Sequence, residues 1–257
     1  MQVTWLDNNS WILNIGKQNI LLDPWLVDSL VFANSPWLFE GKRPQALEIP
    51  ESIDLILLSQ GLEDHAHPPT LKQLDHDIPV VASPNAAKVV QELGYSQITT
   101  LEHGESFTFA DQVEVKAVPG SPIGPTLKEN GYILKDLTTK QSLYYEPHGN
   151  HDPEIKNLAP VDVVITPLVS LALPLVGPII KGQESALQVS KWLQPKFILP
   201  TADAKEVSYQ GLLVSLLSSQ GSLEKFQEML TKNNLNTKII QPQPKQVINL
   251  NEMLNVK

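Results

Sequence analysis

Residues 57–69 read LLSQGLEDHAHPP, and in this stretch polar side chains follow directly on an apolar run. Positions 55–58 are all apolar, which is typical of a strand that is buried on both faces. Two carboxylates and two imidazoles then follow within five residues, namely Glu63, Asp64, His65 and His67. Histidine and carboxylate at the end of a strand are the ligands that hydrolytic zinc or iron sites use. The stretch therefore indicates a metal site, and the alternative is a polar turn in which Asp64 caps the following helix.

A second polar stretch, YYEPHGNHD at residues 144–152, also follows an apolar strand. Four of the six histidines lie in these two stretches, namely His65, His67, His148 and His151. This clustering argues against random placement on the surface, although a Gly-Asn turn with ordinary polar residues would give the same pattern. A third candidate, LPTAD at residues 199–203, also stands at the end of a strand.

The order of expected elements predicts the fold class. Strands are expected at 3–5, 11–15, 19–22, 54–59, 80–83, 99–101, 106–109, 113–118, 131–134, 142–145, 161–165, 197–199, 238–240 and 247–249. Helices are expected at 68–74, 85–93, 184–193 and 222–232. Residues 28–50 show no period and contain prolines, so we expect a loop there. The pattern predicts one α/β (α+β) domain over residues 1–257, with two sheets inside and helices outside.

Composition excludes several classes of function. The net charge is −9 and no Lys/Arg cluster occurs, which argues against nucleic-acid binding. The chain has no cysteine, so disulfides, thiolate catalysis and Cys-ligated zinc are excluded. The absence of cysteine fits a reducing compartment, and the start MQVTWLDNNSW does not resemble a signal peptide. We therefore expect a cytoplasmic protein.

Residues 163–180, VVITPLVSLALPLVGPII, carry no charge. Pro167, Pro174, Gly177 and Pro178 interrupt this stretch, so we expect no membrane span but a strand followed by an apolar loop. The loop at 168–180 has three interpretations: it packs on the core, it lines an apolar pocket, or it meets a protein partner or a membrane surface.

Together these features resemble the metallo-β-lactamase fold. The resemblance rests on the strand that leads to Asp64-His65 and a short helix, on the later strand that ends in a ligand position, and on Pro200-Thr201 near a late strand. It runs from the first hairpin to about residue 203 and is closest to the branch of ascorbate-6-phosphate lactonases and related metal-dependent hydrolases. It implies a four-layer αββα sandwich with metals at the sheet edges, and hydrolysis of lactones, amides, thioesters or phosphodiesters.

The chain departs from the metal-binding pattern of this family. The family's His-x-His-x-Asp-His reads Gln60-Gly61-Leu62-Glu63-Asp64-His65 here, so only the last two ligands remain. Further family ligands correspond to Gly120-Ser121-Pro122 and to Ala202, neither of which keeps a histidine. The resemblance places His148 where the family has an aspartate that bridges two metals.

The resemblance therefore implies an altered site with at most one divalent metal, held by Asp64, His65 and His148. His67, Glu146 or Asp203 would complete or orient this site. Zinc is the first choice, with iron or manganese as alternatives, or no metal at all. The candidate catalytic residues are Asp64, Glu63 and Glu146, with one of the two glutamates as general base.

Two functions follow from the sequence. The first is a hydrolase for a small ester, lactone or phosphoester whose apolar part faces residues 168–180. The second is a metal-free binding or scaffold module with residues 168–180 as its interface. The sequence is compatible with an oligomer.

Overall fold

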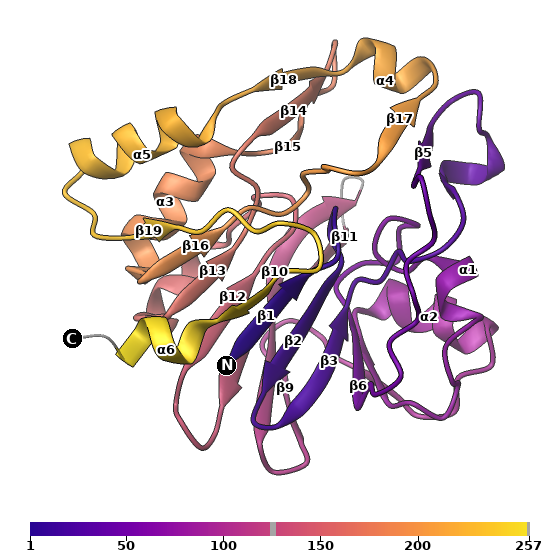
Figure 1. The fold of residues 1–257 in the computed structure, drawn as a ribbon, viewed down its shortest axis with the longest axis horizontal. Helices are drawn as coiled ribbons and strands as arrows, with labels where there is room; N and C mark the ends of the chain where they lie inside the picture. The colour runs from indigo at the N-terminus through magenta and orange to yellow at the C-terminus, as the bar shows by residue number, and fades with distance from the viewer. Residues whose placement is uncertain (124–126, 256–257) are drawn as a thin grey trace. The chain divides into compact units, whose positions relative to one another are not determined.

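The computed structural model describes residues 1–123 and 127–255, which form two compact units (Figure 1). Unit 1 contains residues 1–102, 204–216 and the segment from 243 onward. Unit 2 contains residues 103–203 and 217–242. Each unit is discontinuous because late segments of the chain return to a sheet that earlier residues began. The prediction of one domain over residues 1–257 stays a prediction.

Unit 1 is built on a seven-stranded sheet of order β20-β1-β2-β3-β6-β7-β8. The strands are β1 (Gln2–Trp5), β2 (Trp11–Ile15), β3 (Gln18–Leu22), β6 (Leu55–Leu58), β7 (Val80–Ala82), β8 (Ile98–Thr100) and β20 (Val247–Asn249). Strands β3, β6, β7 and β8 run parallel to one another. The carboxyl ends of β3 and β6 therefore meet at one edge of the sheet.

Helices α1 (Pro68–Leu71) and α2 (Pro84–Glu92) contribute to a hydrophobic cluster with this sheet. Their side chains Leu71 and Val90 pack in one cluster with Ile56 and Leu58 of β6. The other two residues of β6, Leu55 and Leu57, are also fully buried, which confirms a strand with two buried faces. Ser83 begins α2, and its side chain accepts a hydrogen bond from the N–H of Ala86.

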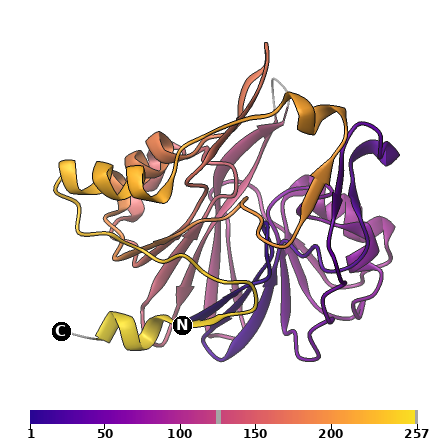
Figure 2. The ribbon, with the colours of Figure 1, turned by 45° about the horizontal axis from the view of Figure 1, so that its top comes forward.

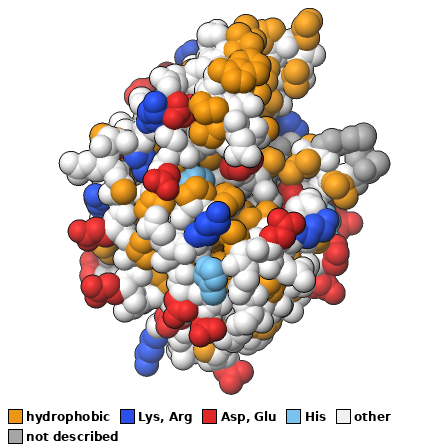
Figure 3. Space-filling model, turned by 90° about the vertical axis from the view of Figure 1, so that its right-hand side faces the viewer, with side chains coloured by type: hydrophobic (Ala, Val, Ile, Leu, Met, Phe, Trp, Pro, Cys, Tyr) orange, Lys and Arg blue, Asp and Glu red, His pale blue; other side chains and the backbone are white. Residues whose placement is uncertain are grey.

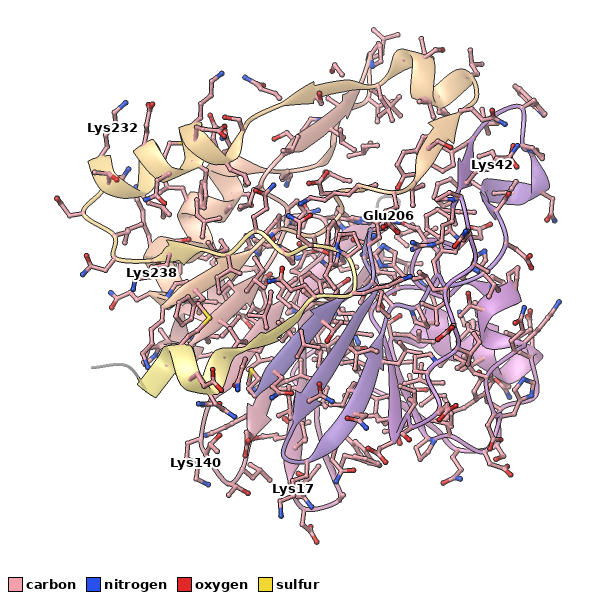
Figure 4. The ribbon with its side chains drawn as sticks, in the orientation of Figure 1. Lys17, Lys42, Lys140, Glu206, Lys232 and Lys238 are labelled. Carbon is pink, nitrogen blue, oxygen red and sulfur yellow. The ribbon has the colours of Figure 1, made fainter. Side chains whose placement is uncertain are left out.

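The late segment of unit 1 is tied to the first hairpin. Asp7 lies buried in the turn between β1 and β2 and accepts hydrogen bonds from the N–H groups of Lys205 and Glu206, both at 3.0 Å. Glu206 is labelled in Figure 4. The segment also includes β17 (Ser208–Gln210), which forms a small sheet with β5 (Glu40–Lys42) and β4 (Leu30–Val31), and α4 (Leu212–Leu216).

Unit 2 is built on a second seven-stranded sheet, of order β19-β16-β13-β12-β11-β10-β9. The strands are β9 (Ser106–Phe109), β10 (Val113–Ile123), β11 (Leu127–Asp136), β12 (Ser142–Tyr145), β13 (Val163–Ile165), β16 (Phe197–Leu199) and β19 (Lys238–Ile239). Helices α3 (Gln183–Leu193) and α5 (Leu223–Lys232) lie near each other beside this sheet (Figure 2). Val189 and Phe226 of these helices pack with Val164 and Ile198 of the sheet. A three-stranded sheet is formed by β15 (Gly177–Ile180), β14 (Ser170–Leu173) and β18 (Ser218–Gln220).

The mixed α/β class is confirmed, and most expected strands and helices lie within a few residues of their predicted positions. Two predictions were wrong in detail. Residues 28–50 are not all loop, because they contain β4, the 3-10 turn Phe32–Asn34 and β5. Residues 168–180 are not an apolar loop but mainly the β14–β15 hairpin. These strands of two to four residues are too short to show a clear period in the sequence, and the prolines in both segments argue against strands.

No helix in the described part of the chain combines the length and the hydropathy needed to cross a bilayer.

Candidate functional site

In unit 1, Asp23 joins the ends of two parallel strands. It follows β3, and its carboxylate accepts hydrogen bonds from the backbone N–H of Ser59, at 2.7 Å, and from the Ser59 hydroxyl, just after β6. The same carboxylate lies 2.7 Å from Nδ1 of His65, and all three residues are fully buried. Sequence reasoning missed Asp23, although an aspartate directly after a strand that runs parallel to β6 was a usable signal.

His65 lies between two carboxylates. Its Nδ1 faces Asp23, and its Nε2 lies 3.2 Å from Oδ2 of Asp64, which also accepts a hydrogen bond from Asn9 at 3.4 Å. Burial acts to lower the pKa of His65, but the carboxylates of Asp64 and Asp23 outweigh it and raise this pKa to about 10. A histidine whose Nδ1 is held by a carboxylate while Nε2 points to another ligand group is the usual arrangement at metal sites.

The other two candidates of the opening stretch make local contacts. His67 precedes α1; its Nδ1 lies 3.0 Å from the Thr70 hydroxyl and its Nε2 3.3 Å from the Ser29 carbonyl oxygen. Burial lowers the pKa of His67 to about 4, so the ring is neutral. Glu63 is partly buried and accepts a hydrogen bond from the N–H of Ala33 at 3.1 Å. Both ring nitrogens of His67 are thus engaged, and a ligand role would require it to release one of them.

In unit 2, Glu146 is fully buried directly after β12 and holds the loop that follows it. One carboxylate oxygen accepts from the Ser121 hydroxyl at 2.7 Å. The other accepts from the N–H groups of Asn150, at 2.6 Å, and His148, at 3.2 Å. Burial raises the pKa of Glu146 to about 7, although these hydrogen bonds act to lower it. Its carboxylate therefore fixes the backbone on both sides of His148.

Gly149 allows this loop to lie close to the segment before α3. Its φ is +73°, and a Cβ at this position would lie 1.9 Å from the Lys181 carbonyl oxygen. The Lys181 N–H donates to the His148 carbonyl at 2.8 Å, and the Ser185 hydroxyl donates to the Gly149 carbonyl. Only glycine fits here, and the backbone of His148 is held from two directions. The His148 residue itself is partly buried.

His151 has a structural environment. Its Nδ1 lies 3.0 Å from the Tyr144 hydroxyl, and its Nε2 lies 3.5 Å from the Thr166 hydroxyl. The Thr166 hydroxyl donates its proton to the Glu146 carbonyl at 3.0 Å, so it can only accept from Nε2 of His151. Nδ1 of the neutral ring then accepts a hydrogen bond from the Tyr144 hydroxyl. Burial, assisted by Lys181, lowers the pKa of His151 to about 3, so the ring is neutral.

The positions that lack the family's histidines lie in different environments. Gln60 is fully buried, Leu62 is partly buried, and Ser121 is a partner of Glu146. Ala202 is partly buried, and the neighbouring Asp203 is exposed. An imidazole nitrogen beside a carboxylate oxygen, as in His65 and Asp64, is a donor pair that suits a divalent metal such as zinc. Gln60, Leu62, Ser121 and Ala202 offer neither an imidazole nor a carboxylate ligand.

Comparison with known proteins places the chain in a family. The family model of the beta-lactamase superfamily domain matches residues 2–202. No match was found among curated proteins. Three solved structures are similar to this chain over at least 96% of its length. An isothiocyanate hydrolase from Delia radicum gut bacteria is 18% identical with a TM-score of 0.71, covering 97% of this chain and 99% of that one.

The second is the metallo-beta-lactamase fold protein YhfI from Bacillus subtilis, which is 12% identical with a TM-score of 0.62, covering 96% of this chain and 99% of that one. The third is CmlA, a diiron beta-hydroxylase from Streptomyces venezuelae, which is 14% identical with a TM-score of 0.69, covering 96% of this chain and 54% of that one. At these identities the structures show the fold alone. The match over residues 2–202, together with the two sheets and their helices, shows that the chain belongs to the beta-lactamase superfamily and has a metallo-β-lactamase-like α/β fold.

Proposed function

We propose that the protein is a hydrolase with a single divalent metal held by Asp64, His65 and His148. The observation that carries the proposal is the environment of His65, whose Nδ1 is fixed by the buried Asp23 while its Nε2 faces Asp64. A histidine that serves only packing does not need a carboxylate on each nitrogen. Zinc is the metal we propose first, with iron and manganese as alternatives.

The surroundings of each proposed ligand support its assignment, considered separately in unit 1 and in unit 2. In unit 1, Asp23 fixes the ring orientation of His65 and makes Nε2 the nitrogen that binds. In unit 2, Glu146 and Gly149 fix the backbone around His148. When bound, a divalent metal would act as a Lewis acid that lowers the pKa of water and polarises the bond to be hydrolysed. Glu146 then acts as a positioning residue, and Asp64 and Glu63 remain the candidates for proton transfer.

The substrate class we propose is a small ester, lactone or phosphoester with an apolar part. The superfamily model supports a hydrolase-like protein, and the likeness to an isothiocyanate hydrolase adds small apolar isothiocyanates to the compounds worth testing. The likeness to a diiron hydroxylase shows that the fold by itself does not select a reaction. We place this activity in the cytoplasm.

The test is a hydrolysis screen with p-nitrophenyl esters, lactones, phosphodiesters and an alkyl isothiocyanate, followed by variants. Asp64→Ala and His148→Ala are expected to lose activity by at least about 100-fold. His67→Gln is the matched control, because it removes a neighbouring histidine whose nitrogens face Thr70 and Ser29. Full activity in both alanine variants would contradict the proposed site.

A second candidate function has its own support. The chain lacks most of the family's histidine ligands, and the β14–β15 hairpin exposes apolar side chains at Leu175 and Val176. A metal-free binding or scaffold module with this hairpin as its interface would explain both. Protein that holds no metal, yet loses a partner when these two residues are made polar, would favour this function over hydrolysis.

A further inference from the structure

The tip of the β14–β15 hairpin presents large apolar side chains to solvent. Leu175 is fully exposed, Val176 is 72% exposed and Ile179 is 39% exposed. In Figure 2 the hairpin projects as a thin ribbon from the rest of unit 2. Figure 3 shows hydrophobic side chains on the molecular surface at the top of its view. Water-exposed apolar residues on a projecting turn need a reason outside the packing of the protein.

The backbone and the side chain of Leu175 are both in unfavourable environments. Its φ is +64°, a left-handed conformation that asparagine or glycine adopts at lower cost than leucine. The side chain is fully exposed, so it contributes no burial either. A leucine at this position is unfavourable both for the backbone and for contact with water. Neither the backbone conformation nor the packing of unit 2 therefore accounts for a leucine at this position.

The small sheet behind the tip carries no charge. Residues 163–180 and 207–223 are the two longest stretches of the sequence without Asp, Glu, Lys or Arg. They pair with each other through β14 and β18, with Ser170 opposite Gln220 and Ala172 opposite Ser218. The first charged residue after the hairpin is Lys181, beyond the end of β15. The hairpin can thus enter a lipid headgroup layer without desolvating a charge.

We propose that the tip of this hairpin inserts into the surface of a zwitterionic lipid bilayer. A second copy of the chain is a poorer occupant, because a stable protein interface buries about 800 Å² on each partner and three side chains at a turn supply far less. The net charge of −9 disfavours anionic lipids. The proposal rests on this surface alone and holds with or without a bound metal.

The test is flotation of the full chain with phosphatidylcholine vesicles. The variant Leu175→Asn with Val176→Thr is expected to bind about tenfold less, because it removes the inserted apolar area. Asparagine suits the left-handed position, so the thermal unfolding midpoint should not fall. Val247→Thr is the matched control, since Val247 is 60% exposed in β20 of unit 1 and should leave binding unchanged.

Several results would overturn the proposal. These are a wild-type chain that does not float with phosphatidylcholine, a tip variant that floats as well as wild type, and binding that appears only when phosphatidylglycerol is added. Sedimentation velocity tests whether a second copy of the chain binds the tip instead. A dimer that the tip variant abolishes, in a protein that does not bind vesicles, would assign the tip to a second copy. Repeating flotation after metal removal separates this result from the hydrolase proposal, because binding should persist.

Discussion

The loops after β6 and after β12 have similar compositions but use their polar groups differently. After β6, the carboxylates of Asp23 and Asp64 face the two nitrogens of His65. After β12, the carboxylate of Glu146 faces backbone N–H groups, and the two ring nitrogens of His151 face the hydroxyl groups of Tyr144 and Thr166. The carboxylates around the loop after β6 therefore fix the orientation of a histidine ring, whereas the carboxylate in the loop after β12 fixes a backbone conformation.

This difference teaches that a cluster of histidines and carboxylates in the sequence does not state the role of each member. The pKa of His65 is raised by Asp64 and by Asp23, which follows a different strand, whereas the pKa of His151 is lowered by burial and by Lys181. Substitutions in the two loops should therefore change the stability of the protein in different ways.

The largest effect is expected from Asp23→Ala. It leaves the imidazole of His65 buried beside one carboxylate and leaves the N–H of Ser59 without its acceptor. We expect a loss of about 4 kcal/mol in the free energy of unfolding, measured with urea. The control is Asp54→Ala, because Asp54 accepts a hydrogen bond from the Asn19 N–H in an exposed position and should cost under about 1 kcal/mol. Equal losses in the two variants would contradict a special role for Asp23.

Gly149→Ala should have the next largest effect, about 3 kcal/mol, because its Cβ would meet the Lys181 carbonyl oxygen. Gly104→Ala is a matched control: Gly104 has a φ of +91°, but a Cβ there meets nothing within 4 Å. We expect about 1 kcal/mol for this control, from the backbone conformation alone. Urea unfolding of both variants separates the cost of the backbone conformation from the cost of the steric clash with Lys181. Equal losses in the free energy of unfolding would show that the close approach to Lys181 is not important.

The third effect concerns pH. The pKa of His151 is lowered to about 3 by burial and by Lys181, below its value of about 6.5 in the unfolded chain. The unfolded state therefore takes up the proton first, and this contribution to stability is complete above pH 6.5 and is lost as the pH falls toward 3. We expect up to about 1.4 kcal/mol less stability per pH unit in this window. His151→Gln should have a shallower slope in urea unfolding between pH 6.5 and 4, and an unchanged slope would contradict a neutral His151.

Much of the fold could be predicted because its main strands are strongly patterned. The apolar run of β6 and the alternation in β2 mark buried strands directly, and Ser83 and Ser222 mark helix starts. The short strands of the β14–β15 hairpin could not be predicted, since they have no polar face to give a period of two.

The sequence names candidate site residues, which stay a prediction, but it does not give the contacts that each of them makes. Asp64 and His65 were named from the sequence, whereas Asp23 was missed, because its contact with His65 becomes evident only once β3 and β6 are known to pair in parallel. The role of Glu146 in binding the backbone also depends on a loop conformation that Gly149 permits. Side-chain chemistry is visible in a sequence, but the partner of each group is set by the fold.

The most direct test of the account is elemental analysis of protein purified without a His tag and without chelator. We predict about one zinc, iron or manganese per chain in the wild type and in His67→Gln, and a loss of that metal in Asp64→Ala, His65→Ala and His148→Ala. A wild type that holds no metal even after incubation with these ions, or a metal that remains in all three alanine variants, would contradict the proposed metal site.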